Sequence, residues 1–190
     1  MLWRRATRSA GDRMISSRVL ASIQRQIWRL LMLAGVQSPP LSAHRLSRIC
    51  ALQRVTVMDS AGLLGLHGAL SVNGRGLVIR VNPALSLEER RFTIAHEIGH
   101  TIIDHDVPVL RSWLAARINR PLQLSEARRE RLCDWIASEI LVPSPAFRAE
   151  AEMAPQPDLL SDRLADFGVP EHLIHAHPQS ERMRQFRFLI

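Results

Sequence analysis

Two histidines four residues apart, with a glutamate directly after the first, lie inside a largely apolar run near the middle of this 190-residue chain. The run reads RFTIAHEIGHTIIDHD and spans residues 91–106. It follows Ser86 to Glu89, whose S-x-x-E form is typical of a capping box at the start of a helix. On a helix, His96 and His100 lie on one face and can reach one point, which Glu97 flanks.

This H-E-x-x-H arrangement is typical of zinc hydrolases. Neutral imidazoles bind Zn²⁺ at about 2.0–2.1 Å, and the ion lowers the pKa of its bound water. A carboxylate beside that water can take its proton during attack on a carbonyl and pass it to the leaving amine. The helix is otherwise mostly apolar, so buried His and Glu need partners. We therefore predict one Zn²⁺ per chain with His96 and His100 as ligands and Glu97 as the catalytic base.

A second long helix is predicted from Ser125 to the residue before Val142, and it offers a third ligand. The residues on one of its faces are Glu130, Cys133, Asp134, Ala137 and Leu141. This face points inward, where a glutamate without a cation costs several kcal/mol. We predict Glu130 as the third metal ligand. We predict Asp134 as the second-shell carboxylate that accepts the other ring N–H of a zinc-bound histidine.

Alternatives on this helix stay open. Glu126 lies one turn earlier on the same face, and Asp134 could itself be the ligand. Cys133 is expected to be a small core residue rather than a ligand. Glu139, on the opposite face, is expected to face solvent.

The remaining elements complete an α+β fold. Helical spacing of apolar residues predicts a helix over residues 16–34 and a shorter one over 41–52. Strands are predicted at 54–58, 65–72 and 76–82, with a hairpin at Asn73-Gly74. We predict a small antiparallel sheet packed on the histidine-bearing helix and on the second, ligand-bearing helix. The strand 76–82 is either an open edge that binds substrate by strand addition or an ordinary core strand.

The N-terminal part of the chain has a large excess of positive charge. All basic residues are arginine, and residues 1–58 hold ten of them against one acid, Asp12. We predict an Arg-rich arm at 1–37 with one amphipathic helix, a zinc metallopeptidase domain at 38–154 and a short helical tail at 155–190. The apolar run 30–36 is too short to span a membrane. Two cysteines fit a reducing compartment, so we expect a cytoplasmic protein.

The segment RFTIAHEIGH, followed by E-x-x-C-D-x-x-A-x-x-I-L-V-P, resembles the ImmA/IrrE family of zinc metallopeptidases over roughly residues 38–143. The resemblance implies a gluzincin-like fold, with His96, His100 and Glu130 as zinc ligands and Glu97 as general base. Better-known members are bacterial proteins that cleave helix-turn-helix repressors of the phage-repressor type. The resemblance therefore implies such a repressor as substrate and partner.

The chain departs from the family pattern at several points, among them Ile136, where many members have Phe. The family often has a histidine four residues after the second ligand, where this chain has Asp104 followed by His105. The chain has no tyrosine, which related peptidases often use to stabilise the oxyanion. His105 is the nearest candidate for an oxyanion or substrate contact. The Arg-rich arm is not part of the family pattern.

The leading hypothesis is a zinc-dependent endopeptidase that cleaves a transcriptional repressor at a specific site. One alternative is a regulatory binding module that keeps the peptidase fold without proteolysis. Another is nucleic-acid binding through the basic arm, although that arm has few aromatic residues and no evident recognition helix.

Overall fold

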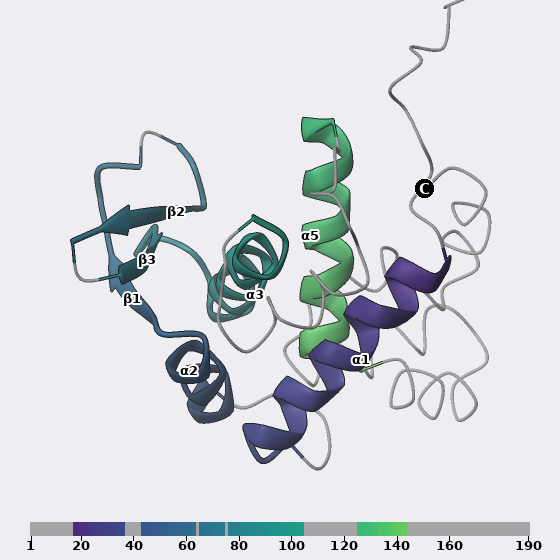
Figure 1. The fold of residues 1–190 in the computed structure, drawn as a ribbon. Helices are drawn as coiled ribbons and strands as arrows, with labels where there is room; N and C mark the ends of the chain where they lie inside the picture. Colours follow the sequence, from purple (N-terminus) through teal and green to yellow (C-terminus); the bar gives the residue numbers. More distant parts are fainter. Residues whose placement is uncertain (1–16, 37–42, 64, 75, 105–124, 144–190) are drawn as a thin grey trace, which may run out of the picture.

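The computed structural model describes residues 17–36, 43–63, 65–74, 76–104 and 125–143. They form four helices and a three-stranded sheet (Figure 1), which confirms an α+β fold. In chain order the elements are α1 (Ser17–Leu33), α2 (Ala43–Leu52), β1 (Val55–Asp59), β2 (Gly68–Asn73), β3 (Gly76–Val81), α3 (Leu87–Asp104) and α5 (Glu126–Leu141). Each lies close to its predicted position. The predicted tail helices and His105 lie outside the described residues.

The sheet has the strand order β1-β3-β2 and is mixed. β2 and β3 are antiparallel, with Gly68 opposite Val81, whereas β1 and β3 are parallel, with Val55 opposite Leu77. The prediction of an antiparallel sheet is therefore wrong for β1. The hairpin signal at Asn73 fixes only the β2–β3 pair. β3 lies between β1 and β2 in the sheet, and no local sequence pattern indicates this strand order.

The central position of β3 decides between the two interpretations of strand 76–82. Both neighbours of β3 are strands, and its Val78, Ile79 and Val81 are buried. It is a core strand, and the alternative of an open edge is wrong. Among the described strands, β1 and β2 form the two edges of the sheet.

The start of α3 follows from two reciprocal hydrogen bonds. The Glu89 N–H donates to Ser86 Oγ at 3.2 Å, and the Ser86 N–H donates to Glu89 Oε2 at 2.9 Å. This is the predicted capping box, which satisfies two backbone donors that the first helical turn leaves unpaired. The cap fixes where α3 begins and therefore which of its residues face the rest of the protein.

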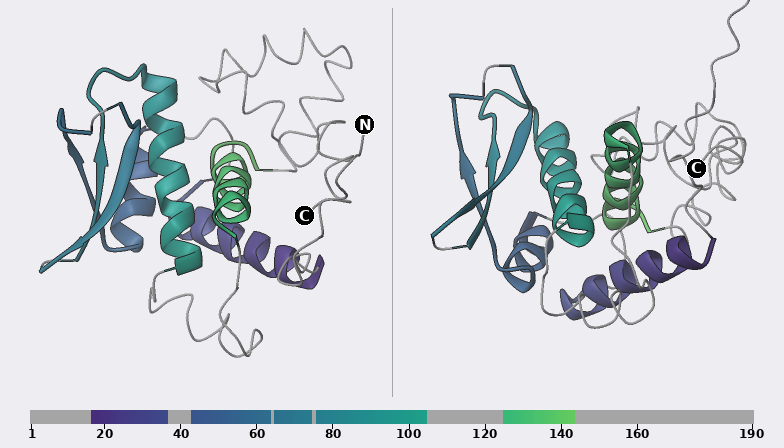
Figure 2. Two further views of the ribbon diagram at one scale, coloured as in Figure 1. Left: turned by 90° about the horizontal axis from the view of Figure 1, so that it is seen from above. Right: turned by 45° about the horizontal axis from the view of Figure 1, so that its top comes forward.

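α3 lies between the sheet and α5, as both views in Figure 2 show. Its Ala95, Ile98 and Ile102 are buried in the core. The two helices approach closely at Gly99, where a Cβ would lie 3.0 Å from the Cys133 Cα and 3.2 Å from its Cβ. Only glycine fits such a contact between backbones without displacing a helix. The contact brings the predicted ligands of α3 and α5 together.

α1 packs against α5 and covers the side of it that was expected to be exposed (Figure 1). Glu139 is fully buried there, and it accepts hydrogen bonds from Gln24 Nε2 at 3.3 Å and Trp28 Nε1 at 3.4 Å. The expectation that Glu139 faces solvent is therefore wrong. Its position on α5 gave no sign that a helix over one hundred residues earlier would cover it.

The described helices were also compared with the length and hydropathy that a membrane span requires. Each of them is too short or too polar to cross a bilayer.

Candidate metal centre

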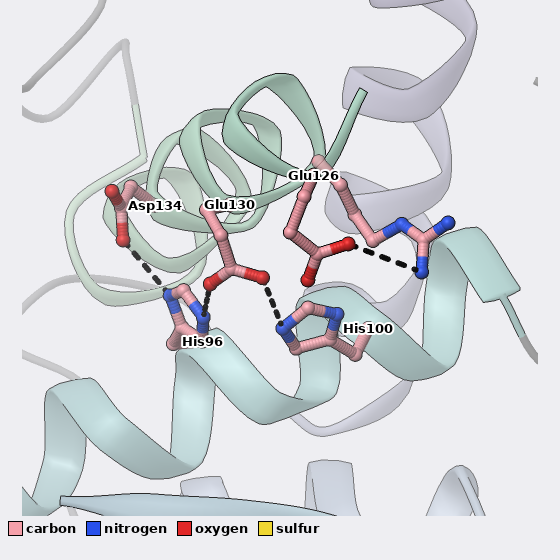
Figure 3. A network of polar contacts seen from close by, with 6 residues as sticks. His96, His100, Glu126, Glu130 and Asp134 are labelled. Carbon is pink, nitrogen blue, oxygen red and sulfur yellow. Dashed lines mark hydrogen bonds and ion pairs between the residues drawn. The ribbon is translucent and has the colours of Figure 1, made fainter. Parts of the chain in front are cut away.

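α3 places the two histidines of HEIGH one turn apart on the side facing α5 (Figure 3). The ring centroids of His96 and His100 are 5.1 Å apart. The side chains are 16% and 17% exposed, so both rings are largely removed from water.

Glu130 reaches both rings from α5 (Figure 3). Its Oε2 lies 3.2 Å from His96 Nε2, and its Oε1 lies 3.4 Å from His100 Nε2. Two ligand atoms that are each about 2.0–2.1 Å from a tetrahedral Zn²⁺ are separated by about 3.3–3.4 Å. Each carboxylate oxygen thus lies near one imidazole nitrogen, at about the separation of two ligands around zinc, and a donor set of two imidazoles and a carboxylate is one that zinc accepts.

Asp134 contacts the other nitrogen of the first histidine. Its Oδ1 lies 2.8 Å from His96 Nδ1, where it accepts the ring N–H and leaves Nε2 directed toward Glu130. Burial lowers the pKa of His96, but the hydrogen bond and charge of Asp134, together with the nearby glutamates, outweigh it and raise this pKa above its ordinary value. Such a carboxylate fixes the tautomer and increases the basicity of a ligand imidazole.

Glu97 is buried beside the two rings and is 8% exposed. Burial raises the pKa of its carboxyl, and the charge of Glu130 adds to this; the two histidines and a hydrogen bond from the Leu70 backbone N–H act in the opposite direction. A carboxyl with a raised pKa is a better proton acceptor at neutral pH than an exposed one. This placement suits a general base next to a metal-bound water.

Edge strand β2 supports this glutamate in a way that the sequence did not suggest. Gly68, its first residue, lies so close to α3 that a Cβ would collide with the Thr93 methyl group and lie 3.5 Å from Glu97 Oε1. Two residues later, Leu70 donates its N–H to the same carboxylate. A glycine at the start of a strand is too common a feature to have identified this contact.

Cys133 also belongs to the cluster. One ligand atom each of His96, His100 and Cys133 lies within 4.8 Å of the other two. Cys133 is fully buried, as predicted for a core residue, but its sulfur is close to both imidazoles. The expectation that it is a core residue is confirmed, and the expectation that it is not a ligand stays a prediction.

The structure also places two of the remaining candidates, Glu126 and Asp134. Glu126 is 77% exposed on the first turn of α5, with its Oε2 4.0 Å from Arg129 Nη1. Asp134 faces the Nδ1 side of His96, away from the Nε2 atom that Glu130 contacts. His105 falls outside the described residues, so its role as an oxyanion or substrate contact stays a prediction.

Known proteins were compared with the sequence and the fold. The Peptidase M78 family model, described as the IrrE N-terminal-like domain, matches residues 53–177. Among solved structures, a Mycobacterium tuberculosis transcriptional regulator superposes with a TM-score of 0.58 at 21% identity, covering 86% of this chain and 49% of that one. This chain thus spans about half the length of that regulator. No curated protein matches the sequence significantly.

The likeness to the regulator shows a shared fold. The family match shows family membership as well, because it spans over half of the chain and includes both helices that bring His96, His100 and Glu130 together. This chain belongs to the Peptidase M78 family of IrrE N-terminal-like domains, as the segment RFTIAHEIGH predicted.

Proposed function

We propose that this protein is a zinc-dependent endopeptidase that holds one Zn²⁺ per chain through His96, His100 and Glu130. The observation that supports it best is the spacing of 3.2 Å and 3.4 Å between the Glu130 carboxylate and the two imidazole nitrogens. Membership of a peptidase family supports the same conclusion. The arrangement of one histidine-bearing helix beside a small sheet and a second, glutamate-bearing helix is gluzincin-like.

The residues around the site then have distinct tasks. A bound zinc ion would polarise the scissile carbonyl and acidify a water molecule. Glu97 accepts the proton of that water at its carboxylate and delivers it to the nitrogen of the leaving amine. Asp134 holds His96 in the tautomer that presents Nε2. Leu70 N–H holds the Glu97 carboxylate in position.

We further propose that the substrate is a helix-turn-helix transcriptional repressor in the bacterial cytoplasm. The ImmA/IrrE resemblance implies such a substrate. The similar structure of a transcriptional regulator is consistent with a role in gene control. A protease with one regulatory substrate needs recognition beyond the metal, and the outer edge of β2 beside Glu97, which pairs with no further described strand, is the surface with which we propose that an extended peptide pairs.

The test uses a helix-turn-helix repressor encoded beside the gene. The zinc-loaded protein is mixed with the purified repressor, and the products are identified by mass spectrometry. We expect one new pair of fragments with the wild type. The Glu97→Gln variant should bind zinc equally well but cleave about 10²–10⁴-fold more slowly.

Two results would contradict the proposal. Normal cleavage by Glu97→Gln would show that Glu97 is not the base. A repressor that binds the zinc-loaded wild type but emerges uncut would favour the alternative of a regulatory binding module.

A further inference from the structure

Cys133 lies where α5 packs tightly against Gly99 of α3. It follows Glu130 by three residues, so both side chains project from the same side of α5. Gly99 leaves so little space that a Cβ on it would touch the Cys133 Cα at 3.0 Å and its carbonyl oxygen at 3.3 Å. With the backbones this close, a side chain one atom longer than alanine is enough to reach the space between the imidazoles.

The sulfur is close to the nitrogens it would have to join. Ligand atoms of His96, His100 and Cys133 all lie within 4.8 Å of one another. Around a tetrahedral zinc ion, a thiolate at about 2.3 Å and an imidazole at about 2.0–2.1 Å are separated by roughly 3.6 Å. A sulfur 4.8 Å from an imidazole nitrogen would have to move inward by about 1 Å to reach this separation. Close packing of position 133 against Gly99 requires only a small side chain. Alanine would meet that requirement, so packing alone does not explain a cysteine, whose sulfur can bind metal.

We propose that Cys133 is a fourth protein ligand of the metal ion, alternating with water. This inference rests on the proposed zinc site of His96, His100 and Glu130. With the thiolate bound, the ion has four protein ligands, which is the closed arrangement of structural zinc sites. With the sulfur displaced, the fourth position is open, as a catalytic site requires.

The exchange is a ligand substitution without electron transfer. When the sulfur–metal bond forms, the S–H proton passes to the buffer and the metal-bound water leaves. When water returns, the sulfur–metal bond breaks and the thiolate takes up a proton from solvent. The chain thus carries a ligand of its own that holds the metal in an inactive form until substrate or another signal shifts the equilibrium.

Cobalt substitution of the full-length protein tests this directly. Tetrahedral Co²⁺ gives visible d–d absorption whatever its ligands, whereas a bound thiolate adds a near-ultraviolet sulfur-to-cobalt charge-transfer band. We expect both features in the wild type. Cys133→Ala should keep the visible bands and lose the near-ultraviolet band. Cys50→Ala is the matched control, because Cys50 is also buried but belongs to α2, and this variant should keep both features.

The outcomes separate this inference from the proposed function. Stoichiometric cobalt with identical spectra in wild type and Cys133→Ala would overturn the sulfur ligand and leave the three-ligand site intact. Failure of the wild type to bind cobalt or zinc would overturn both.

A measurement on the unmodified chain covers the case in which Cys133→Ala does not fold. X-ray absorption at the zinc edge of the substrate-free protein should show a sulfur neighbour at about 2.3 Å besides the nitrogen and oxygen neighbours at about 2.0–2.1 Å. A first shell of nitrogen and oxygen only would overturn the proposal. If it holds, Cys133→Ala should bind zinc about tenfold more weakly and cleave the repressor faster than the wild type, since no thiolate competes with water.

Discussion

Asp134 and His96 are joined by a contact of 2.8 Å between Oδ1 and Nδ1, on the side of the ring opposite the nitrogen that faces Glu130. A single histidine of α3 is thus held between two carboxylates of α5, one turn apart. The pair links the relative positions of the two helices to the orientation of His96 Nε2, the nitrogen that we propose binds the metal.

Loss of the Asp134 carboxylate should weaken zinc binding without abolishing it. In Asp134→Ala the His96 ring loses the acceptor that fixes its tautomer, and we expect an affinity about 10–100-fold lower. Asp134→Asn keeps a carbonyl that can accept the same N–H, so its loss should be smaller. Competition with a chromophoric chelator measures both. Equal affinity in wild type and Asp134→Ala would show that the contact has no role in metal binding.

Zinc binding should depend steeply on pH because a proton competes for His96. Its pKa is raised above 6.5 in the metal-free protein, and only the neutral ring binds metal. Affinity should therefore fall as the pH decreases through this raised value. The free energy of unfolding of the metal-free protein depends on pH in the opposite direction, because the charged ring stabilises the fold. This stabilisation is complete below pH 6.5 and disappears as the pH rises through the raised pKa of His96.

Denaturant unfolding of the metal-free protein at a series of pH values tests the second part. The decline in unfolding free energy above pH 6.5 should be smaller in Asp134→Asn, which lacks the charge that raises the pKa. An unchanged decline in this variant would assign the effect to other groups.

Glu97→Gln should stabilise the metal-free protein at neutral pH. Burial raises the pKa of the Glu97 carboxyl above 4.5, so its ionised form is disfavoured in the fold. Stability is therefore lost as the pH rises from below 4.5 through the raised pKa, and glutamine avoids this loss. The variant's advantage in thermal unfolding should disappear on acidification. A variant less stable than the wild type at neutral pH would contradict the prediction.

Gly68→Ala should disturb the contact between β2 and the base. The added methyl group collides with Thr93, so β2 has to move away from α3, at a cost of about 1–3 kcal/mol. Cleavage should fall as well, because the Leu70 N–H moves with the strand. Gly74→Ala in the hairpin is the matched control, since its Cβ meets nothing within 4 Å. Equal unfolding free energies for the two variants would show that β2 can adapt.

Glu139→Ala should destabilise the protein by about 1–3 kcal/mol. It removes a fully buried acceptor and leaves the Gln24 and Trp28 donors of α1 without it. Glu126→Ala on the same helix is a suitable comparison, because Glu126 is 77% exposed and its loss should stay within about 0.5 kcal/mol. The two variants are compared by denaturant unfolding, and similar midpoints would show that α1 is not held through Glu139.

Local signals in the sequence predicted much of this molecule. The capping box at Ser86 and the helical spacing of His96 and His100 depend only on neighbours along the chain, so they could be recognised directly. Glu130 was predicted because a glutamate on an inward face needs a cation, and Asp134 because it follows one turn later on that face. The structure brings both next to His96, although their side chains are 43% and 44% exposed rather than buried. Their roles in binding a metal stay predictions.

The remainder depended on contacts between distant segments. The parallel pairing of β1 follows from the insertion of β3 beside it, which no turn signal encodes. Glu139 is buried because α1 covers it, and Gly68 matters because β2 lies against α3. Each of these facts requires knowing which surfaces meet, and the pattern of a single helix or strand does not contain that information.

The central claim is that two helices hold one zinc ion between His96, His100 and Glu130. Elemental analysis of the purified wild type beside Glu130→Ala tests it most directly. The account predicts one zinc per wild-type chain and a loss or strong weakening of zinc binding in the variant. A wild type that holds no zinc, even after reconstitution, would contradict it.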